Sequence, residues 1–298
     1  MKPLPSPVTW IGGKAALLPH ILPLLEPRAR ETLYVEPCGG SGVVLLNKRP
    51  HPSEVYNDVD GELVNLFRVL RDPDGVIHLW WELVGTPVAR QEFGDALEAT
   101  RREYSPQPPV KRAAQFVVRC RQRFGGGQPG GAAAESDRNW GTARGSVGGV
   151  NELIHRWLGT MMQLPAIHRR LATVVVDQQD AARCVEQWDS PATLFYVDPP
   201  YIGAEGYYQG GFADEDHARL AAALNAAAAR VVLSYYDHPR VDDLYPADRW
   251  CRKRVSTVTQ ACGNRRANAR SGSRARTELV LTNRDPAAGE DSLFEEAA

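Results

Sequence analysis

Cysteine is scarce and scattered in this chain of 298 residues. There are five, with no CxxC pair among them: Cys38, Cys120, Cys184, Cys251 and Cys262. An odd number without paired spacing argues against a disulfide framework and against a structural zinc site. We therefore expect a protein of the reducing cytoplasm that holds no metal ion.

Long hydrophobic runs are also missing. No stretch approaches the roughly 20 apolar residues that a membrane-spanning helix needs, and the first seven residues, MKPLPSP, lack the apolar centre of a secretory signal. The composition, 43% hydrophobic and 24% charged, is that of an ordinary globular protein long enough for a large core and a second, smaller domain. We expect no contact with a membrane.

An excess of charge of one sign is absent too, because the formal net charge is −1. The basic residues are nevertheless clustered. Residues 249–276 contain nine Lys or Arg and no acid, and a second basic stretch spans residues 111–123. Such clusters on a near-neutral protein predict a phosphate-binding face, although a merely solvated surface is the alternative for either stretch.

Strand and helix patterns alternate in two separate parts of the chain. Residues 1–70 show strands near 32–35 and 54–57, each followed by a helix, as in a nucleotide-binding α/β half. From residue 168 the pattern returns, with strands at 171–176, 193–197 and 231–234, a helix at 217–230, and a closing antiparallel pair at 250–258 and 278–282. We predict one discontinuous catalytic domain made of residues 1–70 and 168–285, followed by a polar tail at 286–298.

The intervening residues 71–167 are rich in arginine and aromatic side chains and read as mostly helical. Within them, residues 124–149 are rich in glycine and predict a long loop. We interpret residues 71–167 as an inserted domain.

The most informative motif is Asp198, Pro199, Pro200 and Tyr201, directly after the apolar run 193–197. This run predicts a buried parallel strand, and ligands bind at the carboxyl ends of such strands. The Asp198 carboxylate and the Pro199 carbonyl can accept two hydrogen bonds from an exocyclic amine, and Tyr201 can stack on a planar base. That is the chemistry needed to hold an adenine amino group for methyl transfer, although the same residues also occur in ordinary turns.

A second motif joins the first strand to its helix and comprises Glu36, Pro37, Cys38, Gly39, Gly40, Ser41 and Gly42. Its glycines allow a tight turn and close approach of a ligand. The turn has neither the Gly-Lys-Ser/Thr ending of a nucleoside triphosphate loop nor a GxGxxG, which argues against a nucleoside triphosphate and against NAD.

Acidic residues follow two further strands. Asp58 is placed to bind ribose hydroxyls, Asp180 could accept from an adenine amine, and Lys14 could pair with a carboxylate. Ribose, adenine and an amino-acid carboxylate together describe S-adenosyl-L-methionine. Each acid taken alone is equally typical of a helix cap.

The sequence resembles the Dam-type N6-adenine DNA methyltransferases, especially their phage-like members. The matching segments are residues 10–14, 34–42, 56–58 with 65–68, 194–201, 232–234 and 278–283. The resemblance implies a Rossmann-like, S-adenosylmethionine-dependent methyltransferase sheet with an inserted, mostly helical target-recognition domain. It also implies site-specific methylation of adenine N6 in double-stranded DNA after base flipping.

The resemblance also assigns roles to individual residues. Trp10 and Lys14 would hold the methionine end of the cofactor, and residues 36–42 would form its loop, with Cys38 where the family often has Phe. Asp58 would bind the ribose and Asp180 the adenine of the cofactor. Asp198, which also borders the cofactor, would take the target amine together with Pro199, while Tyr201 stacks on the flipped base.

The basic clusters have two expected roles on DNA. We expect phosphate contacts from Arg265, Arg266, Arg270, Arg274 and Arg276. We expect base reading or wedging into the duplex from Arg119, Arg121, Arg123 and Phe124. The resemblance further implies a monomer and a restriction-modification setting with a cognate restriction endonuclease, in a bacterial chromosome or a phage.

Three alternatives stay open at this point. N4-cytosine DNA methyltransferases use the same chemistry but usually begin the tetrapeptide with Ser, and protein glutamine methyltransferases usually begin it with Asn. The third alternative is a DNA-binding regulatory module that has lost its activity.

Overall fold

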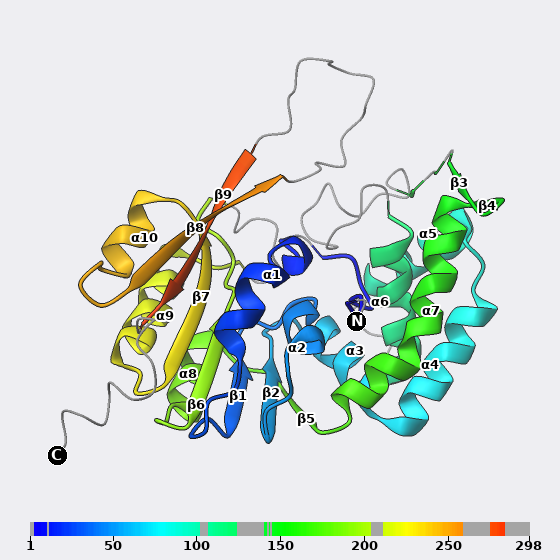
Figure 1. Ribbon diagram of the computed structural model, residues 1–298. Coiled ribbons are helices and arrows are strands. Elements are labelled where there is room, and N and C mark those ends of the chain that lie inside the picture. Colours follow the sequence, from blue (N-terminus) through cyan, green and yellow to red (C-terminus); the bar gives the residue numbers. More distant parts are fainter. Residues whose placement is uncertain are drawn as a thin grey trace.

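The computed structural model describes residues 3–10, 12–101, 107–123, 140–141, 143, 145–203, 211–258 and 275–283. Its centre is a seven-stranded sheet (Figure 1). In spatial order the strands are β5 (Val174–Asp177), β2 (Ser53–Asn57), β1 (Leu33–Glu36), β6 (Thr193–Val197), β7 (Arg230–Tyr236), β9 (Ala275–Thr282) and β8 (Cys251–Val258). The first five are parallel, while β9 runs antiparallel to both β7 and β8. The predicted α/β class and the closing antiparallel pair are confirmed.

Helices cover both faces of this sheet because successive strand residues point to opposite sides. Val35, Phe195 and Leu233 pack in one core with helices α8 (Ala181–Trp188), α9 (Asp214–Ala226) and α10 (Pro239–Leu244). Their neighbours Tyr34 and Tyr196 pack in the other core, with α1 (Leu18–Ile21), α2 (Val43–Asn47) and α3 (Gly61–Arg71). The central strands β1, β6 and β7 are therefore buried on both faces, which explains their continuous apolar runs.

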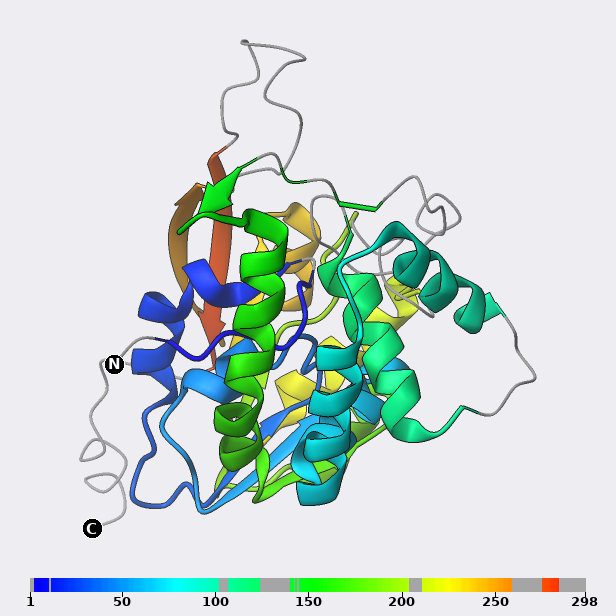
Figure 2. The same cartoon turned by 90° about the vertical axis from the view of Figure 1, so that its right-hand side faces the viewer.

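The predicted insert contributes a layer of helices, which faces the viewer in Figure 2: α4 (Pro73–Gly85), α5 (Arg90–Arg101), α6 (Pro109–Arg121) and α7 (Glu152–Leu171). This helical layer packs on α3 and shares its hydrophobic core, so that Phe67 of α3, Phe116 of α6 and Trp157 of α7 belong to one cluster with the sheet residue Tyr34. The mostly helical prediction is confirmed for the described part. None of the described helices is long and apolar enough to cross a membrane.

Several element boundaries differ from the sequence predictions. Helix α7 continues to Leu171, so β5 begins three residues later than expected. Helix α9 spans 214–226 instead of 217–230, because the acids of its first turn favour a helix N-terminus there. A short hairpin, β3 (Ser146–Val147) and β4 (Val150–Asn151), begins inside the stretch that we expected to be a loop. Residues 14–25 form η1 (Lys14–Ala16), α1 and η2 (Leu22–Leu25), consistent with the prolines at 19 and 23.

Candidate active site

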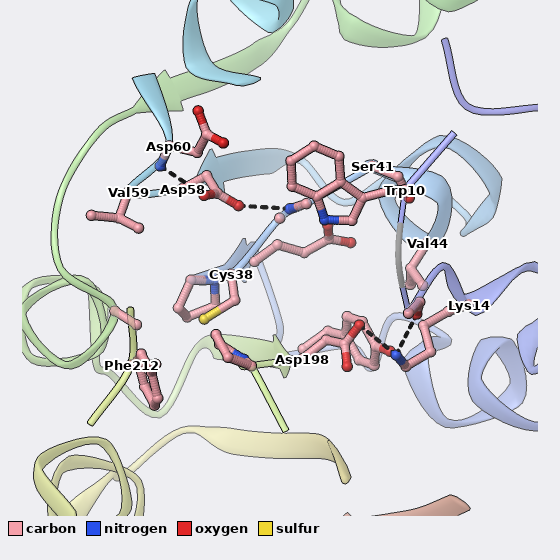
Figure 3. Close-up of a pocket in the computed structure, with 18 of the residues that line it drawn as sticks. Trp10, Lys14, Cys38, Ser41, Val44, Asp58, Val59, Asp60, Asp198 and Phe212 are labelled. Carbon is pink, nitrogen blue, oxygen red and sulfur yellow. Dashed lines mark hydrogen bonds and ion pairs between the residues drawn. The ribbon is translucent and has the colours of Figure 1, made fainter. Parts of the chain in front are cut away.

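A cavity opens where the strand order reverses, at the carboxyl ends of β1 and β6. The chain leaves β1 toward β2 on one side and leaves β6 toward β7 on the other, which is the switch point at which open α/β sheets bind ligands. Acids at the ends of four strands line this cavity: Glu36 at the end of β1, Asp58 after β2, Asp180 after β5 and Asp198 after β6. Figure 3 shows Asp58 and Asp198. The sheet therefore brings together the acids that the sequence placed at successive strand ends.

The glycine loop after β1 is shaped by two aromatic rings beneath it. Tyr56 and Phe67 stack with their ring centroids 3.9 Å apart. A Cβ at Gly39 would lie 2.2 Å from the Tyr56 ring, and one at Gly42, which has φ of 64°, would lie 2.5 Å from Phe67. Only glycine fits at these two positions, because the rings occupy the space that a Cβ would need. The loop backbone at residues 39–41 lines the cavity.

Asp58 is tied to this loop. Its Oδ2 accepts a hydrogen bond from the Gly40 amide at 2.8 Å, and its Oδ1 accepts one from the Asp60 amide at 2.9 Å. Burial raises the pKa of Asp58 to about 6, while the backbone amides of Asp60 and Gly40 oppose that rise. The carboxylate is held at the cavity wall, and each oxygen keeps a lone pair for a further donor.

Asp180 lines the cavity and also caps a helix. Its Oδ1 accepts from the amides of Ala182 and Arg183 at 3.1 and 3.2 Å, and its Oδ2 accepts from Arg219 at 2.9 Å. Asp180 therefore caps a helix, as the alternative interpretation expected, and it also lines the cavity.

Asp198 forms an ion pair with Lys14. The Lys14 ammonium lies 2.8 Å from Asp198 Oδ2 and also donates to the Gly12 carbonyl at 2.6 Å. The other oxygen, Asp198 Oδ1, is buried and has no hydrogen-bond partner within the described structure. Burial raises the pKa of Asp198 above its ordinary value, and the Lys14 charge acts against that rise. The carboxylate partner of Lys14 is thus Asp198 in this conformation, whereas the sequence analysis expected one on a ligand.

Tyr201 lies behind the cavity wall. Its side chain is only 4% exposed, its hydroxyl donates to Glu278 Oε2 at 2.8 Å, and its ring stacks on Tyr235. The Lys14 ammonium lies 4.7 Å from the centroid of the Tyr201 ring. The surface that we expected to meet a base is covered in this conformation. Pro200 lines the cavity, whereas Pro199 is buried.

Glu36 and Cys38 complete the wall next to β1. Tyr34 donates to Glu36 Oε1 at 2.6 Å, and burial raises the pKa of Glu36 to about 8, so this carboxyl group is largely protonated at neutral pH. Burial also raises the pKa of the Cys38 thiol, which keeps this half-buried side chain uncharged.

The structure adds wall residues that sequence reasoning missed. Val59, with 61% of its side chain exposed, and Phe212 lie at one end of the cavity, with Lys14 and Asp198 toward the other (Figure 3). Asp60 lines the cavity as well and caps α3 through the Glu62 amide. Of these residues, only Val59 had a signal in the sequence, because it is an apolar residue directly after Asp58.

Two of the arginines predicted to read DNA point into the protein. Arg119 is 4% exposed and lies 3.5 Å from Glu62 of α3. Arg121 donates to the carbonyls of Ser6 and Pro7. Both predictions are wrong for this conformation, because the face of α6 that carries them packs against the catalytic part. Arg123 is half-buried and forms a backbone bridge with Trp140. Five other predicted DNA contacts lie outside the described residues: Phe124, Arg265, Arg266, Arg270 and Arg274. For Arg276, which belongs to β9, the side chain is not described.

Comparison with known proteins agrees with this geometry. Residues 10–104 and 161–258 match the model of a family described as D12 class N6 adenine-specific DNA methyltransferase. These ranges contain Trp10, Lys14, Asp58 and Asp198 and leave out residues 105–160. The type II methyltransferase M1.LlaDCHI of Lactococcus lactis subsp. cremoris is 26% identical over 290 residues, which cover 92% of this chain and 93% of that relative.

Proposed function

Since this chain belongs to the D12 class of N6 adenine-specific DNA methyltransferases, we propose that its methyl donor is S-adenosyl-L-methionine, bound in the cavity at the ends of β1 and β6. Methyl transfer to adenine N6 in DNA is the activity of the family, which leaves the N4-cytosine, protein glutamine and inactive alternatives without support. The observation that carries the proposal is the buried, unpartnered Asp198 Oδ1 in a cavity that also contains the glycine loop.

The charges of the cavity fit this donor. Among its described lining residues one is basic, Lys14, and five are acidic besides the largely protonated Glu36: Asp58, Asp60, Asp180, Asp198 and Asp216. A carboxylate-rich wall favours a cationic sulfonium ligand and disfavours the polyphosphate of a nucleoside triphosphate or dinucleotide. The acidic wall therefore supports the choice that the missing phosphate-loop motifs suggested.

The remaining wall suits the three parts of the donor. Asp58 and Asp60 would take the ribose hydroxyls, and Val59 with Phe212 offers apolar surface for a purine ring, beside Asp180. Trp10, Glu36 and the loop at residues 37–41 would hold the methionine end, whereas Gly42, which the sequence also predicted to touch the donor, does not line the cavity. Lys14 is assigned differently from the sequence prediction, because its ammonium is already paired with Asp198.

Asp198 is proposed as the acceptor for the target amine. The adenine amine is a poor nucleophile because its lone pair is delocalised into the ring, and a bound sulfonium supplies a methyl group that is already activated by its positive charge. Lys14 occupies Oδ2 and fixes the carboxylate, so that Oδ1 is left to accept an N–H of the amine. A second N–H donated to the Pro199 carbonyl would turn the nitrogen toward a tetrahedral geometry. Orientation of this kind supplies a large part of the acceleration.

Stacking of the flipped base on Tyr201 remains a prediction. In the described conformation the ring is held by Glu278, Tyr235 and Lys14, so stacking requires the ring to be uncovered when DNA binds. Base flipping costs a few kcal/mol, and stacking on an aromatic ring offsets about 1–3 kcal/mol of it.

We further propose that the helical layer, with the rest of residues 71–167, contacts double-stranded DNA, while residues 1–70 and 168–285 carry the catalysis. The shared core of α3, α6 and α7 supports a rigid connection between the two parts. A monomeric state and a cognate restriction endonuclease, both implied by the resemblance, stay predictions.

Expression of the chain in a methylation-deficient bacterium, followed by methylation-sensitive long-read sequencing, tests the proposal. We expect N6-methyladenine at one sequence motif, and none with Asp198→Ala. Titration calorimetry with S-adenosylmethionine tests the donor separately. Methylation retained by Asp198→Ala would refute the role of Asp198, and a wild-type protein that does not bind the donor would refute the assignment of the cavity.

A further inference from the structure

Residues 3–10, here called the N-terminal strap, run between the glycine loop and the helical layer. On the loop side, Ser6 Oγ donates to the Ser41 carbonyl at 2.8 Å. The Trp10 indole also covers Gly40 so closely that a Cβ there would lie 3.2 Å from Trp10 Nε1. Trp10, Gly40 and Ser41 all line the cavity (Figure 3). The strap is therefore part of the wall that the proposed donor touches.

The same strap is held from the other side by α6. Arg121, the last residue of that helix, donates from Nε to the Pro7 carbonyl at 2.9 Å and from Nη2 to the Ser6 carbonyl. The Trp10 ring also meets Phe116 of α6 edge-on, with centroids 6.2 Å apart. One arginine thus spans the gap between the helical layer and the strap that carries Trp10.

Arg121 is an unusual choice for a purely structural contact. Its side chain is half-buried, and this desolvation lowers its pKa to about 10. Within the part of the chain that the structure describes, its hydrogen bonds go to backbone carbonyls and it has no acidic partner, unlike Arg112 and Arg119 of the same helix, which pair with Glu62. Removing a charge from water without a counter-ion destabilises the folded state. The contact between Arg121 and the strap therefore indicates a role beyond stability.

We propose that Arg121 is a positioning residue for the methyl donor, which holds the strap so that Trp10 and the Ser41 carbonyl stay in the arrangement that binds it. Arg121 does not line the cavity and acts through the strap alone. The helical layer thereby contributes to donor affinity from outside the cavity. The inference rests on the proposed binding of S-adenosylmethionine at this cavity.

The test uses the full-length protein and three variants. Arg121→Met removes both hydrogen bonds to the strap, Arg121→Lys keeps the charge, and Ser6→Ala removes the link to Ser41. The matched control is Arg169→Met, because Arg169 is an exposed arginine of α7 that lies outside residues 71–167 and does not line the cavity. Calorimetry gives the dissociation constant of S-adenosylmethionine, and kinetics give kcat and the KM values for the donor and for DNA.

We expect Arg121→Met to weaken donor binding about tenfold, the size that corresponds to losing a pair of hydrogen bonds. The kcat at saturating donor and the KM for DNA should stay at wild-type values, because Arg121 does not line the cavity and its hydrogen bonds go to the strap. Arg121→Lys should recover part of the affinity, Ser6→Ala should lose part of it, and Arg169→Met should match the wild type.

A folded Arg121→Met protein with unchanged donor affinity overturns the inference. If instead DNA binding weakens and becomes less sensitive to salt, Arg121 is a phosphate contact after all. Should Arg121→Met fail to fold, Arg121→Lys and Ser6→Ala carry the test, and wild-type donor affinity in both overturns it. A wild-type protein that does not bind the donor marks failure of the proposed function, and this is seen before any variant is compared.

Discussion

Replacing Lys14 with methionine removes the ammonium that lies 2.8 Å from Asp198 Oδ2 while keeping a side chain of similar length. Burial raises the pKa of Asp198, and the Lys14 charge is the largest influence that opposes this rise. An opposite charge this close favours the ionised form of a carboxyl group, and Lys14→Met loses that preference. Each unit by which the pKa then rises corresponds to about 1.4 kcal/mol at 25 °C.

The ionised Asp198 is the form that accepts the N–H of the target amine, so activity is lost when the pH falls through its pKa. Without Lys14 that pKa rises further, and the acidic limb of kcat/KM should move to higher pH. The assay is transfer of a labelled methyl group to plasmid DNA across a series of buffers. Lys14→Arg, which keeps the charge, should move the limb less than Lys14→Met.

The control for the loss of a lysine as such is Lys111→Met, because Lys111 is exposed on α6 and does not line the cavity. It should reproduce the wild-type pH profile. If Lys14→Met lowers the rate equally at every pH, with its acidic limb in the wild-type position, the ion pair does not control the protonation of Asp198 and the reasoning is refuted.

Three further changes test the surroundings of the site. Glu278→Leu leaves the buried Tyr201 hydroxyl without its carboxylate acceptor, so a double-mutant cycle with Tyr201→Phe should show a coupling of about 1–3 kcal/mol in urea unfolding; strictly additive losses would contradict this contact. Gly39→Ala places a Cβ 2.2 Å from the Tyr56 ring, so calorimetry should show lost donor binding, and unfolding should show a loss of about 1–3 kcal/mol; unchanged binding would show that the loop adjusts freely. Burial raises the pKa of Glu36 from its ordinary value of 4.5 to about 8, so the folded state keeps this proton longer than the unfolded chain. Its stabilising contribution is complete below about pH 4.5 and is lost as the pH rises to about 8, so wild-type unfolding free energy should fall over this range more steeply than that of Glu36→Gln.

The sequence alone determined the class of fold and the acids that meet at one edge of the sheet. Strand β6 coincides with the predicted run 193–197 because a parallel strand buried on both faces must be apolar throughout. Asp198 was placed correctly since the residue after such a strand lies at the ligand-binding edge. The glycines at 39 and 42 were also informative, because a turn that passes over the stacked Tyr56 and Phe67 tolerates no other residue.

Partnerships between distant residues were decided only by the tertiary structure. Arg119 and Arg121 looked like DNA contacts because local sequence does not show which face of α6 meets α3 and the N-terminal strap. Arg121 and Pro7 are 114 positions apart, and Tyr201 and Glu278 are 77 apart. A charged side chain has the same local signature whether it faces water, a phosphate or a buried carbonyl. Packing of the elements selects among these partners, and it therefore set the ion pair of Lys14 with Asp198, the covered ring of Tyr201 and the inward course of Arg121.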